Sequence, residues 1–82
     1  MVLDAGTIYE FGYDGETGPV RAVGMARETD DGDDFEFVTG MAPDGTWQTF
    51  PLEACVFVWP AETETVLTWA TEVGKQVTAA SK

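Results

Sequence analysis

The sequence predicts a small, mainly β domain of five short antiparallel strands followed by one C-terminal α-helix. Gly and Asp recur at short intervals through the first two thirds of the 82 residues, which is typical of consecutive hairpins. After residue 60 this rhythm gives way to apolar residues at helical spacing. So few residues in five strands are expected to curl into a barrel, because closure limits exposed sheet edges.

The strands are marked by alternating side chains and by the turn residues between them. In residues 7–13 the aromatic side chains Tyr9, Phe11 and Tyr13 share one face of the predicted strand. The segments "DGETGP" and "APDG" carry Gly and Pro at positions that favour turns. Pro51 cannot donate to a strand ladder, so it marks a kink or bulge between the last two strands. The five predicted strands cover residues 7–13, 20–26, 35–41, 46–52 and 53–58.

A change of character follows the fifth strand. The pair Trp59-Pro60 is expected to end it, because Pro restricts the preceding residue and fits a first helical turn. Several Thr residues and Gly74 are poor helix formers, so residues 65–71 could instead form a sixth strand. The helix over residues 60–80 is the preferred prediction. Its expected apolar face consists of Val66, Trp69, Ala70, Val73 and Val77.

Together these elements predict a single domain over residues 1–82, with a five-stranded antiparallel SH3/Sm-like β-barrel in residues 7–58 and the helix in residues 60–80. The chain has 15 acidic and 4 basic residues, no His and a net charge of −11. Direct binding to DNA or RNA is disfavoured, because such binding depends on Lys and Arg. The acidity fits a surface adapted to high salt or an acidic face presented to a basic partner.

Other features of the sequence argue for a cytoplasmic protein without a cofactor. Cys55 is the single cysteine, so an internal disulfide is excluded, and its apolar neighbours indicate packing in the core. The start "MVLDAGTIY" has no basic region followed by an apolar run, and "ACVFVWPA" is far too short for a membrane span. No pair of carboxylates stands out as an acid–base pair, and no His is present to activate Cys55. These residues indicate a non-enzyme.

The acidic segment "RETDDGDD" has some features of a calcium loop. With Gly32 as the sixth position, however, Arg27 and Thr29 would occupy the first and third ligand positions. A solvated acidic turn is therefore expected, and no metal site is predicted. The same turn is a candidate surface for a basic protein partner, formed by Glu28, Asp30, Asp31, Asp33 and Asp34.

Four segments in this order resemble the WYL domain, a small SH3/Sm-like barrel of bacterial and phage-defence transcription regulators. They are "TIYEFGY", "GPVRAVGMA", "DDFEFVTG" and "GTWQTFPLEACV", which together cover roughly residues 7–58. The third lies where the family has its Trp-Tyr-Leu triplet, and the fourth resembles the family's closing segment. WYL domains are thought to sense nucleotides or nucleic-acid fragments, whose phosphates Arg binds bidentately.

The chain departs from this family where the ligand would be read. The triplet is Phe35-Glu36-Phe37, and the three arginines of the family's closing segment are replaced by Gln48, Pro51 and Ala54. Of the family's basic residues only Arg21 is matched, and the chain lacks the helix-turn-helix that usually precedes the domain. The resemblance therefore implies a retained scaffold with an altered use. A residual ligand pocket would consist of Arg21, Phe37, Trp47 and Gln48.

Three functions remain open from the sequence. The first is a small acidic binding or regulatory module that acts through protein–protein contacts. The second is an acidic inhibitor or nucleic-acid mimic, for example phage-encoded, that occupies a basic groove of a host protein. The third is a halophilic small barrel domain with a ligand-sensing role. A homo-oligomer is left open, and Trp47, beside a turn, is expected to be partly exposed.

Overall fold

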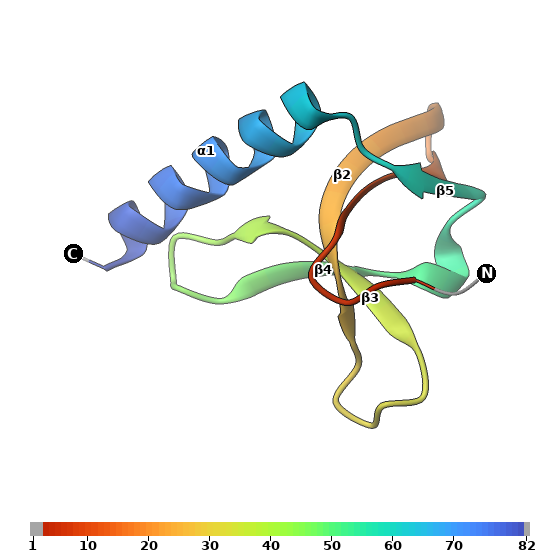
Figure 1. The fold of residues 1–82 in the computed structure, drawn as a ribbon, viewed down its shortest axis with the longest axis horizontal. Helices are drawn as coiled ribbons and strands as arrows, with labels where there is room; N and C mark the ends of the chain where they lie inside the picture. Colours follow the sequence, from red (N-terminus) through yellow and green to blue (C-terminus); the bar gives the residue numbers. More distant parts are fainter. Residues whose placement is uncertain (1–2, 82) are drawn as a thin grey trace.

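The computed structural model describes residues 3–81, so residues 1, 2 and 82 of the predicted domain lie outside the described residues. Five strands are followed by one long helix, as the sequence predicts (Figure 1). Residues 65–71 belong to this helix and not to a sixth strand. The elements are β1 (Ile8–Gly15), β2 (Gly18–Glu28), β3 (Phe35–Met41), β4 (Trp47–Pro51), the 3-10 helix η1 (Leu52–Ala54), β5 (Phe57–Pro60) and α1 (Thr63–Ala80).

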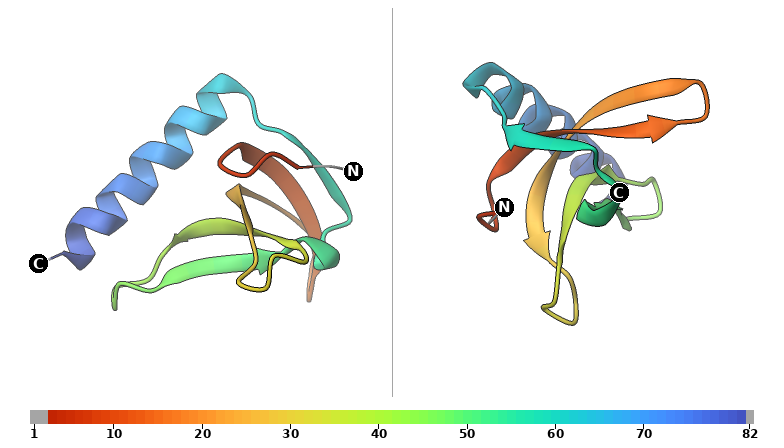
Figure 2. Two further views of the ribbon diagram at one scale, coloured as in Figure 1. Left: turned by 60° about the horizontal axis from the view of Figure 1, so that its bottom comes forward. Right: turned by 90° about the vertical axis from the view of Figure 1, so that its right-hand side faces the viewer.

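The five strands form one antiparallel sheet in the order β4-β3-β2-β1-β5. The chain runs as a meander from β1 to β4 and then returns, through η1, to pair β5 with β1. The sheet is strongly curved, and α1 lies along one side of it (Figure 2). The predicted closed barrel is wrong, because β4 and β5 remain the two edges of the sheet. Pro51 and Pro60 lie on these edges and have no N–H to donate, and β5 is only 4 residues long.

Several boundaries differ from the prediction, although β3 matches it. The second strand begins at Gly18, whose φ of 132° closes a tight turn, and it continues to Glu28. Residues 52–54 form a 3-10 turn where the sequence suggested strand. The last strand covers Phe57–Pro60 and not residues 53–58, so Trp59 and Pro60 are its final two residues. The helix begins at Thr63 and not at residue 60.

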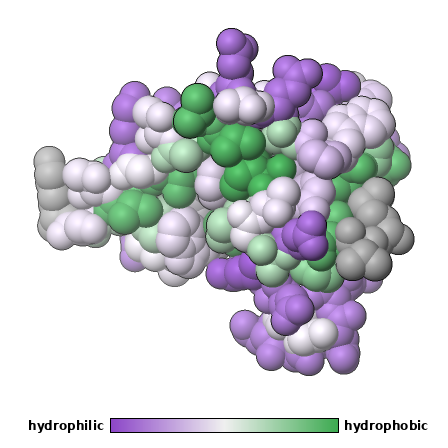
Figure 3. Space-filling model, viewed as in Figure 1, coloured by the Kyte–Doolittle hydropathy of each residue, from purple (hydrophilic) through white to green (hydrophobic). Residues whose placement is uncertain are grey.

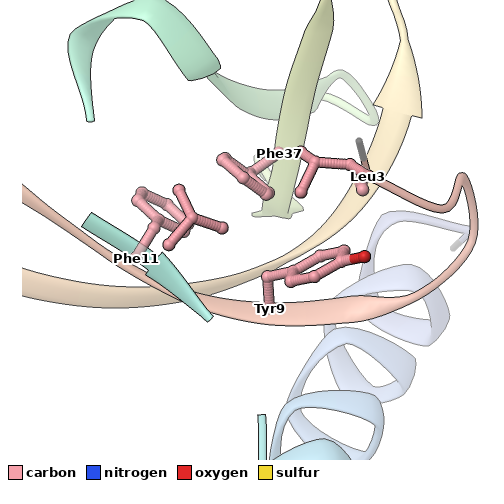
Figure 4. Packing of buried hydrophobic residues seen from close by; sticks show 6 residues of the cluster. Leu3, Tyr9, Phe11 and Phe37 are labelled. Carbon is pink, nitrogen blue, oxygen red and sulfur yellow. The ribbon is translucent and has the colours of Figure 1, made fainter. Parts of the chain in front are cut away.

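The core lies on the concave side of the sheet, here called the inner face (Figure 4). Phe11 and Phe37 have 0% exposure, and their rings stack at 4.5 Å between centroids with 12° between planes. The Tyr9 ring meets Phe37 edge-on, and its hydroxyl accepts a hydrogen bond from the backbone N–H of Asp4 at 3.0 Å. The predicted alternation in β1 is therefore confirmed. The buried core cluster consists of Leu3, Tyr9, Phe11, Ala26, Phe37 and Val58.

The opposite side of the sheet, the outer face, is only partly covered. Here α1 contacts β3 and β2. Val38, which points away from the inner-face residue Phe37, is 2% exposed, and Val73 of α1 is 8% exposed. The Gln76 side chain accepts a hydrogen bond from the backbone N–H of Met41 at 2.7 Å. The helix thus closes a second, smaller apolar layer over β2 and β3, whereas Trp59 of β5 remains 50% exposed.

The predicted apolar face of the helix is correct except at Ala70. Val73 is buried, and Val66, Trp69 and Val77 are half-buried, whereas Ala70 is exposed. Ala70 follows Trp69 by about 100° around the axis, so it turns off the sheet. The poor helix formers find local partners, since the hydroxyls of Thr68 and Thr78 each donate to a carbonyl four residues earlier. Within residues 3–81, no helix has the length and apolar character to span a membrane.

Candidate functional site

Two aromatic side chains stand together on the uncovered part of the outer face. Phe57 and Trp59 of β5 stack with ring centroids 4.4 Å apart and 27° between planes. They occupy alternate positions of one strand, so both project from the same face, opposite to the buried Val58. Trp59 is 50% exposed, so half of this large side chain remains open to solvent although it is stacked on Phe57.

Polar groups on the neighbouring strands hold this stack. The register pairs Trp59 with Glu10 and Phe57 with Gly12, and it pairs Gly12 in turn with Arg21. The Trp59 indole N–H donates to Glu10 Oε1 at 3.3 Å, and Arg21 Nε lies 3.2 Å from the same oxygen. The Arg21 guanidinium carbon is 5.6 Å from the centre of the Phe57 ring, within cation–π range. The four side chains Glu10, Arg21, Phe57 and Trp59 are called the outer patch below.

The four residues of the predicted ligand pocket lie in different parts of the fold. Phe37 is fully buried on the inner face, where it packs against Phe11. Arg21 lies on the part of β2 that pairs only with β1 and belongs to the outer patch. Trp47 and Gln48 are exposed on the edge strand β4, two strands away from β2. Trp47 is 45% exposed, as expected of a tryptophan beside a turn.

The predicted partner-binding carboxylates lie together at the turn between β2 and β3. All five are exposed. Figure 3 shows this turn as a hydrophilic projection at the bottom of the molecule. Glu28, Asp30, Asp31, Asp33 and Asp34 are called the acidic turn below. No cluster of potential metal ligands is present among residues 3–81.

Hydrogen bonds within the acidic turn give it a defined shape. The Asp31 carboxylate accepts from the Thr29 hydroxyl and, at 3.1 Å, from the backbone N–H of Asp33. These bonds, that of Thr29 first, lower the pKa of Asp31 below its ordinary value. The Asp34 carboxylate accepts from the backbone N–H of Phe35 at 2.8 Å. The carboxylates of Asp31 and Asp34 therefore accept hydrogen bonds from neighbouring residues and have fewer free acceptor positions for a partner.

Cys55 packs against the core cluster, as the sequence predicts. Burial raises the pKa of its thiol, which disfavours the reactive thiolate. Its Sγ lies 3.7 Å from the carbonyl oxygen of Pro51, so the side chain contributes to the connection between β4 and β5. The thiol is thus placed for packing.

The sequence alone does not predict a functional role for Glu10, Phe57 or Trp59. The sequence does contain a relevant pattern, because the large aromatics Phe57 and Trp59 alternate in one strand and Phe57 is paired with Gly12 of β1. It was obscured because the strand register was unknown, so nothing aligned Phe57 with the glycine. Trp59 was interpreted as a strand end in front of Pro60, and its exposure depends on where the helix packs.

Comparison of the chain with family models, curated proteins and solved structures finds no match in any of the three. A function is therefore inferred from the geometry of the outer patch and the acidic turn.

Proposed function

We propose that this chain is a non-enzymatic binding module that acts through protein–protein contacts, with the outer patch as its principal contact surface. The observation that carries the proposal is the half-exposed Trp59, stacked on Phe57 and left uncovered by α1. Trp and Arg are enriched among the residues that dominate binding energy at protein interfaces. A large aromatic group on a strand also loses little conformational entropy when a partner covers it.

The internal contacts of the outer patch support this use. Glu10 Oε1 receives both the Trp59 indole N–H and Arg21 Nε, so the three groups are held together before any partner binds. The Arg21 side chain remains 66% exposed and retains donors for a partner's acceptors. An apolar stack bordered by one cation and one anion is the kind of surface that offers both affinity and orientation.

We also propose that the scaffold is an SH3/Sm-like barrel left open at one seam, related to the WYL domain. The meander that returns β5 to the side of β1 supports this relationship. The loss of the family's closing arginines, together with the separation of Arg21 from Trp47 and Gln48, argues for a contact surface in place of a phosphate pocket. The halophilic ligand-sensing alternative gains no comparable support from the described side chains.

A second candidate function is favoured by the acidic turn. Five exposed carboxylates on one preorganised hairpin would suit an acidic inhibitor or nucleic-acid mimic that enters a basic groove. Such charges steer association and act mainly on the on-rate, and their effect fades with salt. An aromatic anchor acts mainly on the off-rate and depends little on salt.

This contrast gives the test. The chain is immobilised and used to capture proteins from an extract of its source organism at about 0.1 M and about 0.5 M NaCl, with three forms compared by quantitative mass spectrometry. The forms are the native chain, Trp59→Ala, and a turn variant with Asp30, Asp31, Asp33 and Asp34 each changed to Asn. The proposal predicts a partner that is retained at high salt and lost with Trp59→Ala. A partner lost with the turn variant and at high salt, but retained by Trp59→Ala, would establish the second candidate instead.

A further inference from the structure

The two edges of the sheet differ in the backbone groups that they leave open. On β5, the N–H of Ala61 donates to the Ile8 carbonyl at the start of β1 at 3.1 Å. Alternation along the strand then directs the backbone groups of Val58 and Pro60 away from β1. Because Pro60 has no N–H, Val58 is the one donor that the four residues of β5 offer on this side. The β5 edge is therefore poorly suited to pair with a further strand.

The edge at β4 is open over a longer stretch. The Thr46 carbonyl accepts a hydrogen bond from a backbone N–H just after β3 at 2.8 Å, and the Gln48 carbonyl accepts one from a β3 hydroxyl at 3.1 Å. Both carbonyls therefore point toward β3, so the N–H and C=O groups of Trp47 and Thr49 point away from the sheet. Figure 2 (left) shows β4 along the lower border of the molecule, remote from α1.

This open edge also lacks the charges that usually protect an edge strand. The residues Trp47–Pro51 include no charged side chain, although the chain has a net charge of −11. Natural edge strands are blunted by charged side chains, Lys above all, or by Pro, and here Pro51 lies only at the last position of β4. Trp47 is 45% exposed at the other end. These features mark β4 as a strand that another strand can extend.

We infer that the strand added at this edge is β4 of a second copy of this chain, paired antiparallel around a twofold axis at Gln48. In this register Trp47 of each copy is opposite Thr49 of the other, and the two Gln48 residues are opposite one another. Each Trp47–Thr49 pair exchanges both of its possible N–H···O hydrogen bonds. All the outward backbone groups of these two residues are then paired, in both copies.

The strand is complementary to itself in its side chains as well as in its backbone. A Trp opposite a Thr is an aromatic–β-branched pair, which is a favourable cross-strand combination. Two opposed Gln amides can each donate and accept a hydrogen bond. Two copies with a charge of −11 repel one another, and the uncharged β4 lets them meet with the least repulsion. Pairing through β4 leaves the outer patch of each copy open, because β5 is the opposite edge of the sheet.

The test is sedimentation equilibrium of the full chain over a series of concentrations. We expect a monomer–dimer equilibrium that shifts toward the dimer between about 0.1 M and about 0.5 M NaCl, because salt screens the repulsion between the copies. Amide hydrogen exchange then identifies the paired strand. The backbone amides of Trp47 and Thr49 should gain protection as the chain concentration rises, and that of Val58 on the opposite edge should not.

Substitutions at Gln48 separate strand pairing from general repulsion. Gln48→Glu and Gln48→Lys change the net charge in opposite directions, but each places like charges directly opposite one another across the twofold axis. Both should weaken the dimer about fivefold, and both should fold because Gln48 is exposed. Thr71→Glu and Thr71→Lys make the same charge changes at an exposed position of α1 and should alter the dissociation constant of the dimer by less than about twofold.

Three results would overturn the inference. They are a chain that stays monomeric throughout the series, protection that appears at Val58 in place of Trp47 and Thr49, and a dimer that Gln48→Lys strengthens. Loss of the dimer in the Gln48 variants should leave capture of a partner through Trp59 unchanged, because the two surfaces lie on opposite edges of the sheet.

Discussion

The ring of Phe57 lies directly over the backbone of Gly12. A Cβ placed on residue 12 would come within 2.0 Å of the Phe57 ring, far inside any real contact. The two residues are paired across β1 and β5, so the aromatic ring covers the space that a side chain on β1 would otherwise fill. Gly12 thereby allows Phe57 to lie flat on the sheet and to stack with Trp59.

Replacing Gly12 with Ala is expected to displace the Phe57 ring and to break the stack. Forcing an extra methyl group into a filled space commonly costs about 1–3 kcal/mol. Urea denaturation should show this loss, and the Trp59 indole N–H signal should move as its environment changes. Unchanged stability and an unmoved signal would contradict the close approach of the two residues.

Gly74 provides the matched control for this substitution. It lies on the exposed side of α1, and a Cβ there would meet nothing within 4 Å. Gly→Ala at such a helix position should therefore stabilise the chain by about 0.5–1 kcal/mol, because Ala loses less backbone entropy than Gly. The same chemical change thus has opposite signs at residues 12 and 74, and one denaturation series measures both.

The packing of α1 on the sheet is tested at Val73. This side chain is 8% exposed, and its removal to Ala deletes about two methylene equivalents, so the free energy of unfolding should fall by about 1.5 kcal/mol. Leu67 of the same helix is 62% exposed, and Leu67→Ala should change stability by less than about 0.5 kcal/mol. Equal effects of the two substitutions would mean that the helix does not pack through Val73.

Acid should destabilise the acidic turn and the turn between β3 and β4, in which the Asp44 carboxylate accepts hydrogen bonds from the backbone N–H and the hydroxyl of Thr46. Hydrogen bonds from Thr29 and the Asp33 backbone lower the pKa of Asp31 from its ordinary 3.8, and those from Thr46 lower the pKa of Asp44 in the same direction. Since these folded pKa values lie below the unfolded ones, the stability they contribute is complete above about pH 3.8 and is lost as the pH falls through the folded values.

Melting temperatures at pH 6 and pH 2.5 check this expectation. The native chain should lose more stability on acidification than a variant with Asp31→Asn and Asp44→Asn, because Asn retains an acceptor oxygen and does not titrate. Asp14→Asn with Asp30→Asn changes the net charge equally at other exposed positions and should behave like the native chain. Identical acid sensitivity in all three forms would show that the turn hydrogen bonds do not couple to folding.

Salt should stabilise the chain. Among residues 3–81, three ion pairs join Arg21 to Glu10, Arg27 to Glu36 and Lys75 to Glu72. The full chain has 15 acidic residues and only 4 basic ones. The screening length falls from about 10 Å at 0.1 M salt to about 3 Å at 1 M, so repulsion among the carboxylates weakens. The melting temperature should rise over this range of NaCl, and it should rise less when the aspartates of the acidic turn are changed to Asn. A flat curve would mean that the acidic charges are too dispersed to repel.

The parts of the fold that could be predicted are those that depend on local pattern. The alternation of Tyr9, Phe11 and Tyr13 identified the inner face, and β3 matched its predicted bounds because turn residues flank it on both sides. The absence of pairing between the edge strands β4 and β5 could not be predicted, because it depends on whether these two strands meet in space. The exposure of Ala70 had a local explanation in the helical angle, but the angle matters only once the orientation of α1 on the sheet is known.

The candidate site was harder to predict for the same reason. The residues of the acidic turn are close together in the sequence, so they lie together in one exposed turn, and their role in binding stays a prediction. The outer patch joins Glu10 on β1, Arg21 on β2 and Trp59 on β5, and only the strand register brings these three together. The predicted grouping of Arg21 with Phe37, Trp47 and Gln48 followed a family resemblance, whereas the structure places Phe37 in the core.

The central claim is that a partner binds over the Phe57–Trp59 stack. Its most direct test is the dissociation constant of the captured partner, measured by calorimetry for the native chain, Trp59→Ala and Trp47→Ala. The two tryptophans are 50% and 45% exposed, so their removal changes exposed aromatic surface to a similar extent. Loss of an interface anchor typically costs 2 kcal/mol or more, so Trp59→Ala should weaken binding roughly 30-fold, while Trp47→Ala should leave it within about twofold. Full affinity in Trp59→Ala, or an equal loss in Trp47→Ala, would contradict the claim.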